Sequence, residues 1–145
     1  MTWKWASLAG FITAVLCLVC LFYRNAILGA GPLTIGIQIA AFGLMVWARV
    51  TFGKRSFHAT ANPTGGGLVT NGPYRYLRHP IYAAALYFMW AGIAVHWSAA
   101  NALIGLIATA GLAVRMLAEE TLIVGKYPEY ADYARRTRRV IPFVL

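Results

Sequence analysis

The sequence has few charged residues, and acidic residues are the scarcest among them. Only 12% of the 145 residues are charged, and Asp and Glu together number 4, whereas hydrophobic residues make up 60% of the chain. The mean hydropathy is positive. A water-soluble globular domain of this length normally has a much larger polar fraction. The composition therefore argues against a soluble protein and favours one that folds in a lipid bilayer.

Cysteine is also scarce, and its placement argues against redox or metal chemistry. The two cysteines, Cys17 and Cys20, form a Cys-x-x-Cys pair inside the first apolar run. Such a pair needs a polar setting, and usually a βαβ unit or a second pair, to act as a redox or metal site. We therefore interpret both as small apolar residues of a helix and expect no metal site. The sequence also lacks a Gly-x-Gly-x-x-Gly turn after a strand, so a Rossmann nucleotide site is not expected.

The excess of positive charge has a pattern typical of membrane proteins. The formal net charge is +9, and the basic residues lie at the ends of apolar runs and in the C-terminal tail. They do not form a basic and aromatic module of the kind that binds nucleic acid, so no nucleic-acid partner is expected. We expect these charges to orient the chain in the membrane and to contact lipid headgroups.

Four apolar runs, at residues 5–23, 33–50, 80–97 and 102–118, can cross a bilayer as helices. The first is expected to be a retained helix because no small-residue cleavage site closes it. The last two are rich in Ala and Gly, which allow close packing in membranes, so we expect them to form a helical hairpin. The sequence thus predicts a single all-α integral membrane domain over residues 1–145, a bundle of about four transmembrane helices with a C-terminal cytoplasmic segment.

The distribution of basic residues predicts the orientation of this bundle. An even number of spans puts both termini on one side, together with loop 51–79 and the basic tail. Arg24 and the uncharged turn at 98–101 would then lie on the other side. By the positive-inside rule, the termini and the long loop are expected to face the cytoplasm across an inner or cytoplasmic membrane.

A polar segment before the third run holds the residues most suited to binding a ligand. Pro80 is well placed at the first position of a helix, which makes His79 the predicted N-cap. The helix start would then have unpaired N–H groups directed toward the loop. Arg78 and Tyr82 can lie near it, so a carboxylate or phosphate would meet N–H groups, a guanidinium and a phenol together. The alternative is a helix start that faces lipid headgroups.

Two adjacent glutamates, Glu119 and Glu120, follow the fourth run. Both are costly to bury in a membrane. Arg115 lies one helical turn before Glu119, so the two residues can form an i,i+4 ion pair. The glutamates are therefore expected either to end the span as an interfacial ion pair or to form part of a site, and the residues alone leave both interpretations open.

The C-terminal half contains an ordered set of short motifs. They are Gly72-Pro73-Tyr74-x-x-x-Arg78-His79-Pro80-x-Tyr82, the pair Glu119-Glu120, the run Tyr127-Pro128-Glu129-Tyr130-Ala131-Asp132-Tyr133, and the ending Arg139-Val140-Ile141-Pro142. In this order, over about residues 69–145, they resemble the isoprenylcysteine carboxyl methyltransferase family and the related phospholipid methyltransferases. Each motif alone is common, whereas the ordered combination is specific. One departure is that the family commonly has Phe-Gly where this chain has Tyr127-Pro128, with a spacing shorter by one residue.

The resemblance implies an α-helical membrane enzyme that binds S-adenosylmethionine without a Rossmann sheet and methylates a lipophilic acceptor. The implied reaction is carboxyl O-methylation of an isoprenylcysteine-like or otherwise lipid-modified substrate. The residues implied in cofactor binding are Tyr74, Arg78, His79, Pro80, Tyr82, Glu119 and Glu120. A basic residue near the tail would hold the substrate carboxylate, and the candidates for this catalytic role are Arg139, Arg136 and Lys126.

Two other functions fit the sequence. A phospholipid or small-molecule methyltransferase would use the same cofactor site, and an amine acceptor would need a base such as His79 or a glutamate. A non-catalytic membrane transporter or assembly protein would place ionisable residues at mid-span, whereas this chain has them at the ends of its runs. The sequence leaves the oligomeric state open.

Overall fold

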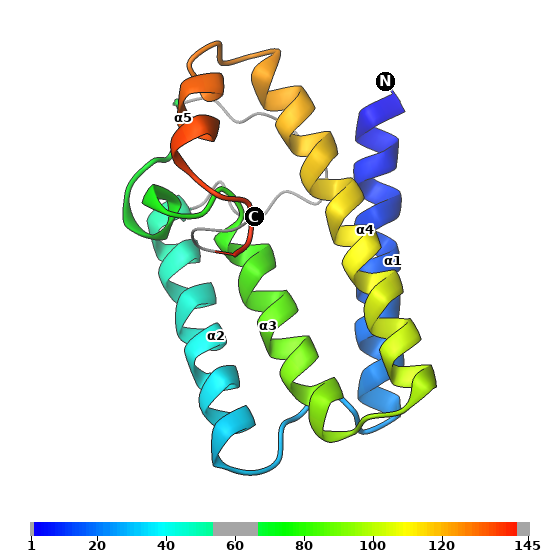
Figure 1. Cartoon of the computed structure of the whole chain (residues 1–145). Coiled ribbons are helices and arrows are strands. Elements are labelled where there is room, and N and C mark those ends of the chain that lie inside the picture. The colour runs from blue at the N-terminus through cyan, green and yellow to red at the C-terminus, as the bar shows by residue number, and fades with distance from the viewer. Residues whose placement is uncertain (1, 54–66, 142–145) are drawn as a thin grey trace.

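The computed structural model describes residues 2–53 and 67–141, and within these ranges the chain is helical with no strand (Figure 1). Its elements are α1 (Thr2–Tyr23), α2 (Pro32–Phe52), the 3-10 helix η2 (Gly72–Arg75), α3 (Pro80–Val95), α4 (Ala99–Val124) and α5 (Tyr130–Arg136). The all-α prediction is confirmed. Much of the loop expected over 51–79, and Pro142 of the last motif, lie outside the described residues.

Three of the helices, α1, α2 and α4, are long and apolar enough to span a bilayer. Helix α3 has 16 residues, a length of about 24 Å that is shorter than a hydrocarbon core of about 30 Å. Large apolar side chains are exposed along the bundle, among them Leu16, Phe42 and Leu103. Water would solvate such a surface poorly, whereas lipid solvates it well. The protein is therefore an integral membrane protein.

The membrane helices pack mainly as two pairs, α1 with α4 and α2 with α3 (Figure 1). Two glycines allow the first pair to approach closely, because a Cβ atom on Gly10 would lie 2.4 Å from the carbonyl oxygen of Gly111. The predicted hairpin of the third and fourth runs is present as an antiparallel connection. However, Gly111 serves the contact with α1, a partner that the sequence pattern did not indicate.

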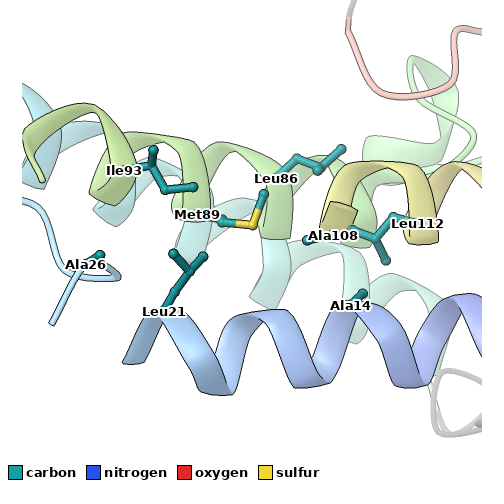
Figure 2. Packing of buried hydrophobic residues seen from close by; sticks show 8 residues of the cluster. All are labelled: Ala14, Leu21, Ala26, Leu86, Met89, Ile93, Ala108 and Leu112. Atoms are coloured by element: carbon teal, nitrogen blue, oxygen red, sulfur yellow. The ribbon is translucent and has the colours of Figure 1, made fainter. Parts of the chain in front are cut away.

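Buried apolar side chains hold α3 against the α1 and α4 pair (Figure 2). Met89 and Ile93 of α3 are almost completely buried, as is Leu21 at the end of α1. The whole cluster consists of Ala14, Leu21, Ala26, Leu86, Met89, Ile93, Ala108 and Leu112. This packing fixes where the start of α3 lies relative to the last turns of α4.

Helix α4 extends beyond the predicted run 102–118 at both ends. It begins at Ala99, because the side chain of Ser98 caps it by accepting a hydrogen bond from a backbone N–H. It continues past both predicted site glutamates to Val124. The helix thus extends beyond the apolar run that ends at residue 118, since glutamate is a good helix former and both carboxylates have cationic partners. Helix α3 is shorter than predicted and ends at Val95 rather than at residue 97.

The two ends of the bundle differ in character. The start of α1, the end of α2, the start of α3, the end of α4 and helix α5 all lie at one end, called the polar end below (Figure 1). The short connections after α1 and α3 lie at the other end. There Arg24 Nε donates to Asn101 Oδ1 at 2.6 Å, and Gln38 Nε2 donates to the Phe88 carbonyl at 3.0 Å. These contacts fix the far end, and the sequence motifs gather at the polar end.

Candidate functional site

The C-terminal tail is paired with the segment that precedes α3. Leu77 and Arg138 form an isolated parallel bridge. The N–H of Arg78 donates to the Arg138 carbonyl at 2.6 Å, and the N–H of His79 donates to the Arg139 carbonyl at 3.0 Å. This pairing brings together two motifs that are far apart in the sequence and places both beside the last turns of α4.

Glu120 is held by three nitrogen-bearing side chains from two segments outside its own helix. Its Oε1 lies 3.2 Å from Arg78 Nε and 3.2 Å from His79 Nε2, and its Oε2 lies 3.0 Å from Arg139 Nη2. Only 13% of the Glu120 side chain is exposed. A carboxylate buried to this degree needs paired, hydrogen-bonding partners. Glu120 therefore ties α4 to both the segment before α3 and the tail.

Glu119 has a different set of partners. The Tyr82 hydroxyl donates to its Oε1 at 2.6 Å. Arg115 Nε lies 3.1 Å from the same oxygen, which confirms the predicted i,i+4 pair. Oε2 lies 3.7 Å from His79 Nδ1, which is beyond hydrogen-bond distance. One oxygen of Glu119 is thus well satisfied, and the other keeps capacity to accept a hydrogen bond.

His79 is the N-cap of α3, as predicted, and its ring lies between the two carboxylates. The ring also stacks on that of Tyr82, with centroids 5.6 Å apart. The expectation that unpaired N–H groups of the first turn form an anion site at this helix start stays a prediction. The N–H of His79 already donates to the Arg139 carbonyl, and the anions beside the ring are Glu119 and Glu120. At this helix start, the described polar contacts of the His79 ring are therefore made by side chains.

Two tyrosines of α5, to which the sequence assigned no definite role, are buried beside this network. The rings of Tyr130 and Tyr133 have centroids 5.7 Å apart, and the Tyr133 hydroxyl donates to the Tyr74 carbonyl at 2.6 Å. Burial raises the pKa of both phenols, that of Tyr133 to about 12. Both are therefore neutral donors at physiological pH. Their i,i+3 spacing, which puts two side chains on one helix face, was the available sequence signal.

The structure brings together five of the seven residues expected to bind the cofactor. These are Arg78, His79, Tyr82, Glu119 and Glu120. The other two are buried parts of the framework. Tyr74 packs on Phe52 of α2, with ring centroids 5.3 Å apart, and Pro80 opens α3.

The candidates for holding the substrate carboxylate are separated by the fold. Arg139 belongs to the network through Glu120. Arg136 is exposed and donates to the Asp132 carbonyl at 3.3 Å, and Lys126 is exposed with its ammonium 5.6 Å from the ring centroid of Tyr127. The structure therefore places one of the three beside the glutamates.

The network has groups suited to two parts of S-adenosylmethionine, its carboxylate and its ribose. Arg78 Nη1 donates to the Ala134 carbonyl at 2.8 Å, while its buried Nε has no aligned hydrogen-bond partner among the described residues. A ligand carboxylate would supply that acceptor. Glu119 Oε2 has the free capacity that a ribose hydroxyl requires. These two groups therefore fit the carboxylate and the ribose of the cofactor.

These features define a class: a helical integral membrane protein with a buried carboxylate and arginine network at one end of the bundle. The model of the phospholipid methyltransferase family matches residues 25–130, a range that includes the start of α3 and both glutamates. The chain belongs to the phospholipid methyltransferase family, which covers proteins related to isoprenylcysteine carboxyl methyltransferases.

One curated relative is the cobalt-zinc-cadmium resistance protein CzcN of Cupriavidus metallidurans. It is 28% identical to this chain over 109 residues, which cover 74% of this chain and 46% of the relative. The chain thus spans less than half the length of that protein. No solved structure has significant similarity to the chain.

Proposed function

We propose that this protein transfers a methyl group from S-adenosylmethionine to a lipophilic acceptor in the membrane. The observation that carries the proposal is the Glu119 and Glu120 network, which unites the start of α3, the end of α4 and the tail. The first two segments lie within the range that the family model matches, and the tail holds the last motif of the resemblance drawn from the sequence. A purely structural ion pair at the end of a span would not need residues from three segments.

Different residues of the network would bind different parts of the proposed cofactor. Arg78 would bind the methionyl carboxylate through its buried Nε, and Glu119 Oε2 would accept a ribose hydroxyl. When bound, the cofactor supplies an electrophilic methyl group on a sulfonium. The protein then has to hold the acceptor in line with that methyl group and exclude water, which can supply most of the acceleration.

Arg139 is suited to hold an acceptor carboxylate. Its Nε and Nη2 are directed at Glu120, while an arginine has five N–H donors in all. The Nη1 group is therefore available to a second carboxylate, and 44% of the side chain is exposed. The hydrogen bond to Glu120 raises the pKa of Arg139, so the guanidinium stays charged. We infer that the acceptor carries a carboxylate, as an isoprenylcysteine-like molecule does.

The depth of the site suits an acceptor that arrives from the lipid. Helix α3 is about 6 Å shorter than a hydrocarbon core of about 30 Å. We therefore infer that His79, at its start, lies no farther out than the boundary between hydrocarbon and headgroups. A carboxylate on a lipophilic molecule would reach this level without leaving the membrane, and the soluble cofactor would arrive from the aqueous side. By the positive-inside rule, we assign that side to the cytoplasm.

A phospholipid amine is the second candidate acceptor, favoured by the family model that matches the chain. An amine has to lose a proton when it is methylated. His79 can accept one at a ring nitrogen, and the ring lies between the two carboxylates. A carboxylate acceptor would need no such base.

The proposal is tested with purified protein in detergent. Isothermal titration should show saturable binding of S-adenosylmethionine and of S-adenosylhomocysteine. Labelled cofactor is then incubated with an N-acetyl-farnesyl-cysteine analogue, a phosphatidylethanolamine or a short water-soluble carboxylic acid. We expect transfer to the farnesyl-cysteine analogue. Transfer to the amine lipid alone would favour the second candidate, transfer to the soluble acid alone would contradict entry from the lipid, and absence of cofactor binding would contradict the proposed function.

A further inference from the structure

Arg115, a buried cation in α4, contacts a residue of the proposed cofactor site from the side that faces α1. Arg115 is only 4% exposed and lies between α1 and α3. Its guanidinium carbon is 4.6 Å from the ring centroid of Phe11 on α1. On the other side, its Nε donates to the Tyr82 hydroxyl at 2.6 Å. This residue thus connects the first helix of the bundle to the network of Glu119.

The chemistry of these groups fixes the direction of the hydrogen bonds. Arginine can only donate, so the Tyr82 oxygen accepts from Arg115. The single hydroxyl proton of Tyr82 is then left for Glu119 Oε1, which accepts it at 2.6 Å. The order Arg115 to Tyr82 to Glu119 has no alternative arrangement with the same contacts. A chain of this kind holds a carboxylate in one rotamer.

The consequence concerns the second oxygen of Glu119. Oε1 is occupied by the Tyr82 hydroxyl and by Arg115 Nε at 3.1 Å. Oε2 is thereby turned toward His79, whose Nδ1 is 3.7 Å away. We propose that Arg115 is a positioning residue, which acts through the Tyr82 hydroxyl to present Glu119 Oε2 to the cofactor. This role rests on the proposed function and adds to its site a residue that orients Glu119 without contacting the cofactor.

A purely structural role for Arg115 makes a different prediction. A charge inside a membrane bundle needs a partner, and Glu119 would satisfy that need whatever the ligand. In that case, loss of the Tyr82 hydroxyl would lower stability and leave cofactor affinity unchanged. A positioning role instead couples Tyr82 and Arg115 to cofactor affinity, and only while Glu119 is present. A double-mutant cycle separates these two cases.

The experiment measures S-adenosylhomocysteine affinity by isothermal titration in detergent, beside thermal unfolding of each variant. The variants are Tyr82→Phe, Glu119→Gln and the double variant, with Arg115→Met alone and in the Glu119→Gln background. Tyr82→Phe keeps the ring that stacks on His79 and removes only the hydroxyl, so it remains informative if Arg115→Met does not fold. Matched controls are Tyr23→Phe, at the far end of α1, and Arg135→Met, on the exposed side of α5.

We expect Tyr82→Phe to weaken binding about tenfold, the size typical of a lost hydrogen bond to a charged group. In the Glu119→Gln background the same change should have an effect of less than about twofold. The controls should bind like the unsubstituted protein. Unchanged affinity in Tyr82→Phe, or an equal loss in both backgrounds, would overturn the positioning role. If the unsubstituted protein binds no cofactor, the proposed function itself fails.

Discussion

Arg139 Nη2 lies 3.0 Å from Glu120 Oε2, and Arg139 Nε lies 3.3 Å from both oxygens of the same carboxylate. The pair joins the C-terminal tail to α4. Because Arg78 and His79 also contact Glu120, Arg139 is one of three partners. Because Arg78 and His79 would still hold Glu120 without Arg139, loss of Arg139 should affect binding of the acceptor more than binding of the cofactor.

The first prediction is that Arg139→Ala impairs use of the acceptor more than binding of the cofactor. The apparent KM of a carboxylate acceptor should rise, or turnover fall, by about tenfold or more, as expected for a lost charge-assisted bond. Cofactor affinity should fall by less than it does in Glu120→Ala. Steady-state kinetics with titration of the cofactor measures both. Arg136→Ala is the matched control on the same tail, and an equal loss in both variants would argue against a specific role.

The second prediction concerns the two residues at the centre of the network. Glu120→Ala and His79→Ala should each weaken S-adenosylmethionine binding by tenfold or more, or about 1.4 kcal/mol. The reason is that each change leaves buried charged or polar partners without a hydrogen bond. Cys17→Ala and Cys20→Ala, which lie in α1 away from the network, should bind normally. Normal affinity in both network variants would return Glu120 and His79 to purely structural roles.

The third prediction tests the orientation in the membrane. A cysteine introduced at Arg138, at the polar end, should be protected from an impermeant thiol reagent in intact cells and should react in broken cells. A cysteine at Ala30, in the exposed connection between α1 and α2, should react in intact cells. Both are placed in a Cys17→Ala, Cys20→Ala background to remove the natural thiols. The reverse labelling pattern would show that the polar end faces away from the cytoplasm.

The fourth prediction tests the contact between α1 and α4. Gly10→Ala should lower thermal stability in detergent by about 1–3 kcal/mol, because overpacking forces backbones apart. The added Cβ would lie 2.4 Å from the Gly111 carbonyl oxygen. Gly43→Ala in α2 is the control, since nothing lies within 4 Å of its position. If both substitutions change the unfolding temperature equally, the close contact of α1 with α4 is not as described.

The candidate site shows what one sequence can predict about its own ligand-binding residues. His79 as the N-cap of α3 and the ion pair of Arg115 with Glu119 were both predicted, since each depends on residues within one helical turn. That Arg139 meets Glu120, while Arg136 does not, was not predictable. The choice between two arginines three residues apart depends on the pairing of the tail with the segment before α3.

The sequence by itself determined the solvent, the helices and the family of this protein. Long apolar runs require lipid, and a backbone in lipid has to satisfy its hydrogen bonds within helices, while the ordered motifs indicated methyltransferases. Tertiary structure alone decided that α4 packs on α1, that Phe11 covers Arg115, and that the two glutamates have different partners. These contacts depend on how whole helix surfaces fit together. Successive side chains of a helix point in directions that differ by ~100°, so a small change in how two helices pack changes which groups meet.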